Sequence, residues 1–275
     1  MKAPIVTLTT DWGTRDFFVA MVKGKLCSLV PGVTVVDISH NQQWNDSAST
    51  IGILRYGCAS FPEGTVHVVD VGCDCQQPDG RPLLGVANPL LAHVEGQYII
   101  CSNRRLLEMS LNAECDDVVE LPLPQDMDSF TFLACDMYCD VVRRIIEGVP
   151  LSELGTATEP LRRRMQAQAL SDGSRLEAIV TSIDSYGNAN LNVSYSDFEQ
   201  IRNGRRFRVK IEWRSGSNDR FEDITRICRH YSDVRLGNIL LTVSVTGQLQ
   251  IAINRGSAAQ LVGLRYASRC FFQFE

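Results

Sequence analysis

Residues 5–16 read Ile5-Val6-Thr7-Leu8-Thr9-Thr10-Asp11-Trp12-Gly13-Thr14-Arg15-Asp16, and this stretch decides the fold of the first half of the chain. Its first four residues are apolar or β-branched, which predicts a short buried strand that ends in a turn around Gly13. A helical pattern begins near Asp16 and ends at about Leu29. Asp11 and Asp16 therefore bracket the carboxyl end of a strand and the start of the next helix, where open α/β sheets bind ligands.

These two carboxylates allow two interpretations. A carboxylate at such an edge can accept two hydrogen bonds from a vicinal diol, or it can pair with an ammonium group. Alternatively, Asp16 only caps the helix and Asp11 only shapes the turn. The stretch by itself does not decide between a ligand site and a structural role.

The residues that follow alternate between strand and helix patterns. The predicted strands cover residues 33–38, 65–71, 83–87 and 97–101. The predicted helices cover residues 48–59, 105–111 and 134–147. This alternation predicts an α/β domain with a largely parallel sheet and helices on both of its faces.

The pattern changes in the last hundred residues to short β segments separated by turns. The predicted strands there cover residues 176–182, 189–193, 207–213, 238–245, 249–253 and 269–274. Their number and spacing predict a small antiparallel β-barrel domain. We therefore expect an α/β domain at residues 1–158, a linker at 159–174 and a β-barrel domain at 175–275.

Composition narrows the class of protein. A chain of 275 residues is long enough for two domains, and its formal net charge of −5 gives no basis for binding nucleic acid or an anionic membrane. No apolar run approaches the about 20 residues of a membrane span, and no signal-peptide pattern is present, so we expect a cytoplasmic protein. The ten cysteines lack zinc-ribbon spacing, so we expect no metal site, and Cys27, Cys58 and Cys101 are predicted to be small core residues.

Two short motifs in the second half combine polar groups with aromatic rings. Asp184, Tyr186 and Asn188 fall within five residues between two predicted strands, and Tyr231 lies in a second polar turn. Rings stack on a flat heteroaromatic base and an amide can bind its edge, so both motifs suit such a ligand. The alternative is a plain hairpin turn, with both tyrosines in the core.

Seven motifs together carry a resemblance to a known family. They are residues 10–16 (Thr-Asp-Trp-Gly-Thr-Arg-Asp), 36–40 (Val-Asp-Ile-Ser-His), 61–67 (Phe-Pro-Glu-Gly-Thr-Val-His), 151–155 (Leu-Ser-Glu-Leu-Gly), 184–188 (Asp-Ser-Tyr-Gly-Asn), 231–234 (Tyr-Ser-Asp-Val) and 251–259 (Ile-Ala-Ile-Asn-Arg-Gly-Ser-Ala-Ala). In this order and spacing the chain resembles, nearly end to end, the S-adenosylmethionine (SAM) hydroxide adenosyltransferases. These are adenosine-forming SAM hydrolases related to the fluorinase and chlorinase. The resemblance implies a homotrimer that binds SAM or adenosine between subunits and needs no separate cofactor.

The resemblance also implies roles at the ribose and methionine end of the ligand. Asp11 would hold the ribose hydroxyls, and Trp44 would stand beside the ribose and the sulfonium. Asp16 and Asp184 would meet the methionine amino acid. Phe132 is also expected among the substrate-binding residues. A sulfonium and an ammonium favour a pocket lined by acids and aromatic rings.

Adenine recognition is implied for the second half of the chain. Tyr186 and Tyr231 would flank the base, and Asn188 would bind its edge. The backbone near Asn254 and Arg255 would complete the site. These assignments agree with the amide and aromatic content of the two motifs.

The chain departs from the family at the catalytic residues. There, an aspartate, an arginine and a histidine are thought to orient and activate the water that attacks the ribose C5′. Asp70 matches the aspartate, Arg81 is the nearest candidate for the arginine, and Leu133 occupies the histidine position. Leucine can neither transfer a proton nor orient a water, and such a group typically contributes about 10²–10⁴-fold. We therefore expect a SAM hydrolase with a weakened catalytic site.

Two alternatives remain open from the sequence. One is a non-catalytic protein that binds SAM, adenosine or another nucleoside. The other is a SAM-dependent halogenase, although Ala134 stands where such an enzyme has a small polar group for the halide. Turnover of SAM to adenosine and methionine separates hydrolase from binder, and a 5′-halo-adenosine product would identify a halogenase.

Overall fold

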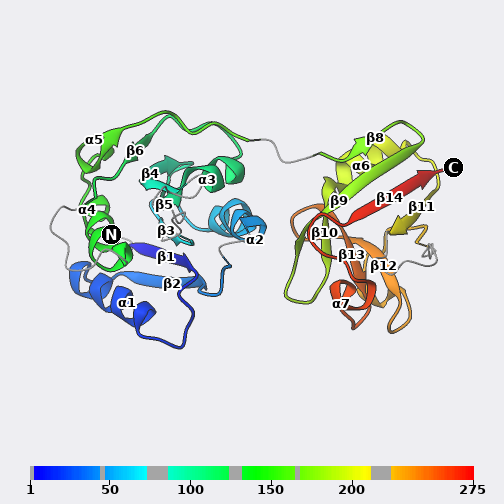
Figure 1. Cartoon of the computed structure of the whole chain (residues 1–275), viewed down its shortest axis with the longest axis horizontal. Helices are drawn as coiled ribbons and strands as arrows, with labels where there is room; N and C mark the ends of the chain where they lie inside the picture. The colour runs from blue at the N-terminus through cyan, green and yellow to red at the C-terminus, as the bar shows by residue number, and fades with distance from the viewer. Residues whose placement is uncertain (1–2, 44–46, 73–85, 124–131, 165–167, 212–223) are drawn as a thin grey trace, which may run out of the picture. The chain divides into compact units, whose positions relative to one another are not determined.

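The computed structural model of the chain describes residues 3–43, 47–72, 86–123, 132–164, 168–211 and 224–275. The chain divides into two compact units, Met1–Arg164 and Met165–Glu275. Figure 1 labels the helices and strands of each unit. No helix in the described part of the chain combines the length and the apolarity needed to cross a membrane.

The first unit is built on a seven-stranded sheet. In spatial order its strands are β2 (Thr34–Ser39), β1 (Ile5–Thr10), β3 (Val66–Asp70), β5 (Gln97–Asn103), β4 (Val86–Val94), β6 (Val118–Glu120) and β7 (Thr156–Ala157). β1 pairs in parallel with β2 and β3, and β3 pairs in parallel with β5. β4, β6 and β7 join through antiparallel pairs. The prediction of a largely parallel sheet is thus confirmed for the half that carries the candidate site, within a sheet that is mixed as a whole.

The antiparallel half begins with a hairpin. β4 and β5 are joined by Glu95 and Gly96, whose φ angles of 49° and 79° suit a tight two-residue turn. The sequence predicted a strand at 83–87. Residues 83–85 lie outside the described residues, and β4 begins at Val86 and continues to Val94. Its pairing with β5 shifts register between Val86 and Leu90, around Pro89, which cannot donate a ladder hydrogen bond. Pro89 therefore made most of β4 difficult to predict from the sequence.

Helices cover both faces of this sheet (Figure 1), as predicted. Neighbouring residues of one strand pack on opposite sides: Val68 belongs to one apolar cluster and Val69 to the other. The first cluster includes residues of α1 (Phe18–Leu29), η3 (Ala134–Tyr138), α4 (Cys139–Ile146) and α5 (Leu151–Leu154). The second includes residues of α2 (Ser47–Gly52), η1 (Ile53–Gly57), η2 (Cys58–Ser60) and α3 (Arg104–Ser110).

The second unit is built on an antiparallel sheet. Its order is β11 (Phe207–Ile211), β14 (Arg269–Phe274), β9 (Arg175–Ile183), β10 (Ala189–Ser194), β13 (Gln248–Ile253) and β12 (Ile239–Val243), with β8 (Leu170–Ser171) beside β9. The terminal strands β11 and β12 do not pair with each other in the described residues. Isolated bridges join Ile224 to Val209 and Ile227 to Leu241. The predicted antiparallel architecture is confirmed, but the sheet is not a closed barrel.

Three helical segments of the second unit were not predicted: α6 (Tyr195–Arg202), η4 (Tyr231–Asp233) and α7 (Ala258–Val262). Ser194 caps α6 by accepting a hydrogen bond from the Asp197 amide at 3.0 Å. Of the predicted linker, Arg164 lies against the first unit, where its Nε donates to Glu108 at 2.5 Å. β8 already belongs to the second unit.

The cysteine prediction is correct in two of its three named cases. Cys58 and Cys101 are buried, and burial raises the pKa of each thiol to about 12. Cys27 is exposed, because it lies on the outer side of α1, opposite the face that buries Val22 and Leu26. The two buried thiols are inert packing groups near neutral pH.

Candidate functional site

The carboxyl ends of β1 and β3 lie side by side and bring two predicted site residues together. Thr10 pairs with Asp70 in the register of these parallel strands, so Asp11 follows at the same edge. The Asp11 amide donates to the Asp70 carbonyl oxygen at 3.3 Å. The Gly72 amide donates to Asp11 Oδ2 at 2.7 Å. Asp11 is exposed, whereas Asp70 is 7% exposed, so one carboxylate faces solvent and the other lies in the edge of the core.

Trp12 connects these loops to a third predicted residue. Its Nε1 donates to Asp70 Oδ2 at 2.7 Å. Its ring meets Phe132 edge to face, with centroids 4.9 Å apart, and the Phe132 ring also lies 5.0 Å from Phe18. Asp11, Asp70 and Phe132 therefore form one cluster around the indole. Trp12 had no predicted role, since an aromatic ring next to a glycine is equally suited to packing.

His40 binds the loop that follows β1. Its carbonyl oxygen accepts from the Gly13 amide at 2.7 Å, and its Nδ1 lies 2.7 Å from Thr10 Oγ1. Its Nε2 lies 3.1 Å from Asp37 Oδ1, in a contact that is not well aligned as a hydrogen bond. Burial favours a higher pKa for Asp37, but the hydrogen bond from Lys23 at 2.6 Å and the nearby His40 imidazole outweigh it, so the pKa is lowered and the carboxylate stays charged.

Asp16 and Leu133 are the other predicted site residues of the first unit that the structure describes. Asp16 is exposed in the loop before α1. Leu133 is partly buried at the start of η3 and packs against the apolar cluster of the α1 side. Trp44 and Arg81 lie outside the described residues. The structure therefore gives no position for the candidate arginine.

The second unit holds an open pocket of about 880 Å³. Its lining includes five predicted adenine-site residues: Tyr186, Asn188, Tyr231, Asn254 and Arg255. Tyr186 is 82% exposed and Tyr231 is 48% exposed, so the alternative that both rings belong to the core is wrong. The volume lies within the range of about 300–1,000 Å³ that is usual for small-molecule sites.

Hydrogen bonds from Asp184 organise one wall of this pocket. Asp184 Oδ1 accepts from the amides of Tyr186 and Asn188, both at 2.9 Å. Asp184 Oδ2 accepts from Asn188 Nδ2 at 2.9 Å. The side chain of Asn188 is thereby held in one orientation, with its amide nitrogen toward Asp184.

Gln250 connects Asp184 to Tyr231, and no motif in the sequence predicted this role. This residue of β13 is 4% exposed, and its Nε2 donates to Asp184 Oδ2 at 3.3 Å and to Asn190 Oδ1 at 2.9 Å. Its Oε1 accepts from the Tyr231 hydroxyl at 3.1 Å. Burial, followed by the charge of Asp184, raises the pKa of Tyr231, so the hydroxyl remains a donor. The available signal was a glutamine between Leu249 and Ile251, at a position that the strand buries.

A glycine allows the 184–188 turn to dock against α7. Gly187 has a φ of +81°, and a Cβ there would lie 2.0 Å from Ser257 Oγ. Ser257 is the N-cap of α7, and the Ala259 amide donates to the Gly187 carbonyl oxygen at 2.9 Å. The turn therefore requires glycine for both its conformation and its close approach.

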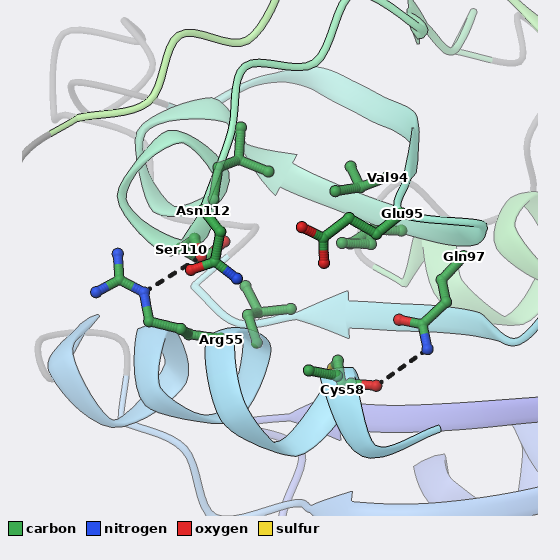
Figure 2. Close-up of a pocket in the computed structure, with 11 residues that line it drawn as sticks. Arg55, Cys58, Val94, Glu95, Gln97, Ser110 and Asn112 are labelled. Carbon is green, nitrogen blue, oxygen red and sulfur yellow. Dashed lines mark hydrogen bonds between the residues drawn. The ribbon is translucent and has the colours of Figure 1, made fainter. Parts of the chain in front are cut away.

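A further cavity in the first unit does not fit a nucleoside. Figure 2 shows its lining, with Arg55 Nε donating to the Ser110 carbonyl oxygen at 3.4 Å and Gln97 Nε2 donating to that of Cys58 at 3.2 Å. Its volume is about 30 Å³, which is space for one or two waters. It also lies beside the β4–β5 turn, at the amino ends of the parallel strands, opposite the edge that carries Asp11 and Asp70.

In the described part of the chain, no three His, Cys, Asp or Glu side chains gather in a way that could hold a metal ion. The chemistry available at the site is that of carboxylates, amides and aromatic rings. Such groups bind hydroxyls, cationic groups and flat bases.

Comparison with known proteins gives matches over most of the chain. Residues 6–155 match the family model of the SAM hydroxide adenosyltransferase N-terminal domain, and residues 178–270 match that of the C-terminal domain. An (R)-S-adenosyl-L-methionine hydrolase of Salinispora tropica is 29% identical, over 97% of this chain and 96% of that protein. A fluorinase of Actinoplanes is 26% identical over 76% of this chain and 78% of its own length. The crystal structure of an uncharacterized conserved protein from Thermotoga maritima has the same fold, with a TM-score of 0.76 at 20% identity, covering 98% of this chain and 99% of that one.

Proposed function

The chain belongs to the SAM hydroxide adenosyltransferase family, and we propose that it is an enzyme that hydrolyses SAM to adenosine and methionine. The observation that carries the proposal is the match of both family models, supported by a hydrolase relative that aligns nearly end to end. In the reaction, the oxygen of water bonds to the ribose C5′ while the C5′–S bond breaks. The sulfur keeps the electron pair as neutral methionine, and the attacking water releases one proton.

The cluster at the carboxyl edge of the first unit would hold the reacting end of the substrate. The exposed carboxylate of Asp11 is suited to the ribose hydroxyls, and Asp70 is suited to orient the water and accept its proton. Phe132 and Trp44 would border the sulfonium, and Asp16 would attract the methionine ammonium. Methionine leaves as a neutral thioether, so the leaving group needs no acid.

The pocket of the second unit would hold adenine. Tyr186 and Tyr231 offer exposed rings for stacking, and the backbone at Asn254 and Arg255 completes the lining. The amide nitrogen of Asn188 donates a hydrogen bond to Asp184. The carbonyl oxygen of the Asn188 side chain is therefore suited to accept a hydrogen bond from the exocyclic amino group of the base. Asp184 would add negative charge for the methionine ammonium.

A complete site needs groups from both units. The candidate diol acceptor Asp11 belongs to the first unit and the candidate adenine residue Asn188 to the second. We propose that the two come from neighbouring subunits of a homotrimer, as the family resemblance implies. No separate cofactor is needed for this displacement.

Leu133 favours one alternative, a non-catalytic protein that binds SAM or adenosine. Its aliphatic side chain packs against the apolar cluster and offers no proton acceptor beside the water. The hydrolase proposal therefore includes a rate about 10²–10⁴-fold lower than that of a family member with aspartate, arginine and histidine in place.

The test is an assay of purified protein with SAM, read by chromatography of adenosine and methionine and run beside an intact-triad relative. We expect detectable hydrolysis that is well below that of the relative. We also expect that Leu133→His alone raises it little, because residues that act as one unit are not additive. Adenosine binding without any turnover would support the binder instead, and a 5′-halo-adenosine formed with chloride or fluoride would identify a halogenase.

A further inference from the structure

We propose that Trp12 is a positioning residue, whose indole N–H fixes the carboxylate of Asp70 for the attack of water on SAM. This inference rests on the proposed function and adds to it a residue that acts through Asp70. The observation that carries it is the 2.7 Å hydrogen bond from Trp12 Nε1 to Asp70 Oδ2.

Three contacts restrain the indole of Trp12. The Phe132 ring meets it edge to face with centroids 4.9 Å apart, and the His40 ring is stacked with it at a centroid distance of 6.1 Å. The following residue, Gly13, is anchored to the His40 carbonyl oxygen at 2.7 Å. A donor supported in this way restricts the carboxylate that it binds, which a mobile surface side chain cannot do.

Asp70 is in a setting where such a donor matters. It is 7% exposed, and its chain neighbours Val69 and Val71 are buried in the apolar cluster of the α2 side. A buried carboxylate needs hydrogen-bond donors to remain charged, and only a charged carboxylate can accept the proton of the water.

The replacement at position 133 increases the importance of this contact. Leu133 offers no group to orient the water from the opposite side, so orientation depends more strongly on the Asp70 carboxylate. Misplacement of a reacting group by about 1 Å can cost 10²-fold in rate. The Trp12 indole is a rigid connection from the β1 loop to that carboxylate.

The experiment is a double-mutant cycle with Trp12→Phe, Asp70→Asn and the double variant, measuring kcat and KM for SAM. Phenylalanine keeps an aromatic ring at position 12, removes the N–H donor and is smaller than the indole. We expect Trp12→Phe to lower kcat by about tenfold to a hundredfold, with KM changed less than about twofold. In the Asp70→Asn background, Trp12→Phe should lower kcat little further, because the carboxylate through which Trp12 acts is already absent. Tyr56→Phe, an aromatic change on the exposed side of η1, is the matched control and should leave kcat unchanged.

Other outcomes overturn the inference in distinguishable ways. Multiplicative effects in the double variant would mean that Trp12 does not act through Asp70. A raised KM with unchanged kcat would place the indole against the substrate instead. A wild-type protein without any turnover would overturn the proposed function and this role together.

A measurement that needs no turnover covers the case of a poorly folded variant. In ¹⁵N-tryptophan-labelled protein, the indole N–H of Trp12 should exchange slowly with solvent and shift on Asp70→Asn. Trp44→Phe and Trp213→Phe assign the other two indole resonances, which identifies that of Trp12. If the Trp12 indole N–H exchanges rapidly with solvent and its chemical shift does not change in Asp70→Asn, the hydrogen bond does not persist in solution.

Discussion

His67 shows how one buried polar residue joins strands of the first unit. It lies in β3 with no exposed surface, and its Nδ1 is 2.7 Å from Thr7 Oγ1 in β1. Its Nε2 is 3.2 Å from Gln97 Oε1 in β5, and Gln97 Nε2 donates to the Phe61 carbonyl oxygen at 2.6 Å. Because Gln97 presents its oxygen, Nε2 of His67 carries the proton and Nδ1 accepts from Thr7. The ring is satisfied as the neutral form, and burial lowers the pKa of His67 to about 4.

This lowered pKa makes stability depend on pH. Between the ordinary value of 6.5 and about 4, the unfolded chain takes up a proton on His67 that the folded chain does not. The free energy of unfolding should therefore fall as pH decreases, with His67 contributing a loss of about 2 kcal/mol between pH 7.5 and pH 5. Urea unfolding of wild type and His67→Gln at both pH values measures this loss, which the variant should lack. His93→Gln, at a half-exposed side chain, is the control and should behave as wild type. An equal pH dependence in the wild type and the His67 variant would contradict the prediction.

At the scale of elements, the candidate site depends on how strands end. β1 and β3 are parallel neighbours in register, so their loops meet and Asp11 can accept from Gly72. In the second unit, β10 and β13 are antiparallel neighbours, and Asn190 pairs with Gln250 across them. That pairing places the Gln250 amide beside the 184–188 turn, where it links Asp184 to Tyr231.

The Gln250 link predicts an effect on ligand binding. Gln250→Leu removes the hydrogen bonds to Asp184 and Tyr231, so both walls of the pocket lose a common anchor. We expect adenosine affinity, measured by isothermal titration calorimetry, to fall about tenfold or more, from the loss of one to two net hydrogen bonds. Gln248→Leu, the same change two residues earlier in β13, is the matched control. Equal effects of the two changes would show that the link to Asp184 and Tyr231 does not organise the pocket.

At the scale of the whole molecule, each unit supplies a different part of the ligand chemistry. The first unit gathers two carboxylates around an indole, and the second presents two exposed tyrosine rings around an amide. In the described residues, neither unit alone combines a candidate ribose acceptor with an adenine pocket. Oligomer formation is therefore part of the functional proposal.

Subunit complementation tests the shared site. Asp11→Ala and Asn188→Ala proteins should each be nearly inactive, but co-refolding them in equal amounts should restore activity in about a quarter of the sites, as expected for a closed ring with sites between subunits. SAM turnover of the mixture, compared with each variant alone, measures the recovery. Mixing Asp11→Ala with Asp70→Asn is the control and should restore nothing, because both changes lie in the same unit. No recovery in the first mixture would mean that each subunit builds its site from its own two units.

The sequence by itself determined most strands and the places where candidate ligand groups stand. Its predictions fall on β1, β3, β5 and the six long strands of the second unit, because alternation and turn residues act over a few positions. It also placed Asp11 and Asn188 at strand ends or turns. The family resemblance supplied the assignment of Asp70 and the significance of Leu133.

Only the tertiary structure decided which of these groups meet. Trp12 reaches Asp70 across 58 positions of the chain, and Gln250 reaches Asp184 across 66. Local patterns carry no information about such contacts, since an indole or a buried amide suits many neighbours until strand pairing chooses one. The same reason explains why the sequence could predict a β-barrel domain but not whether the barrel closes. Whether β11 and β12 pair depends on the curvature and register of the whole sheet, which no single strand encodes.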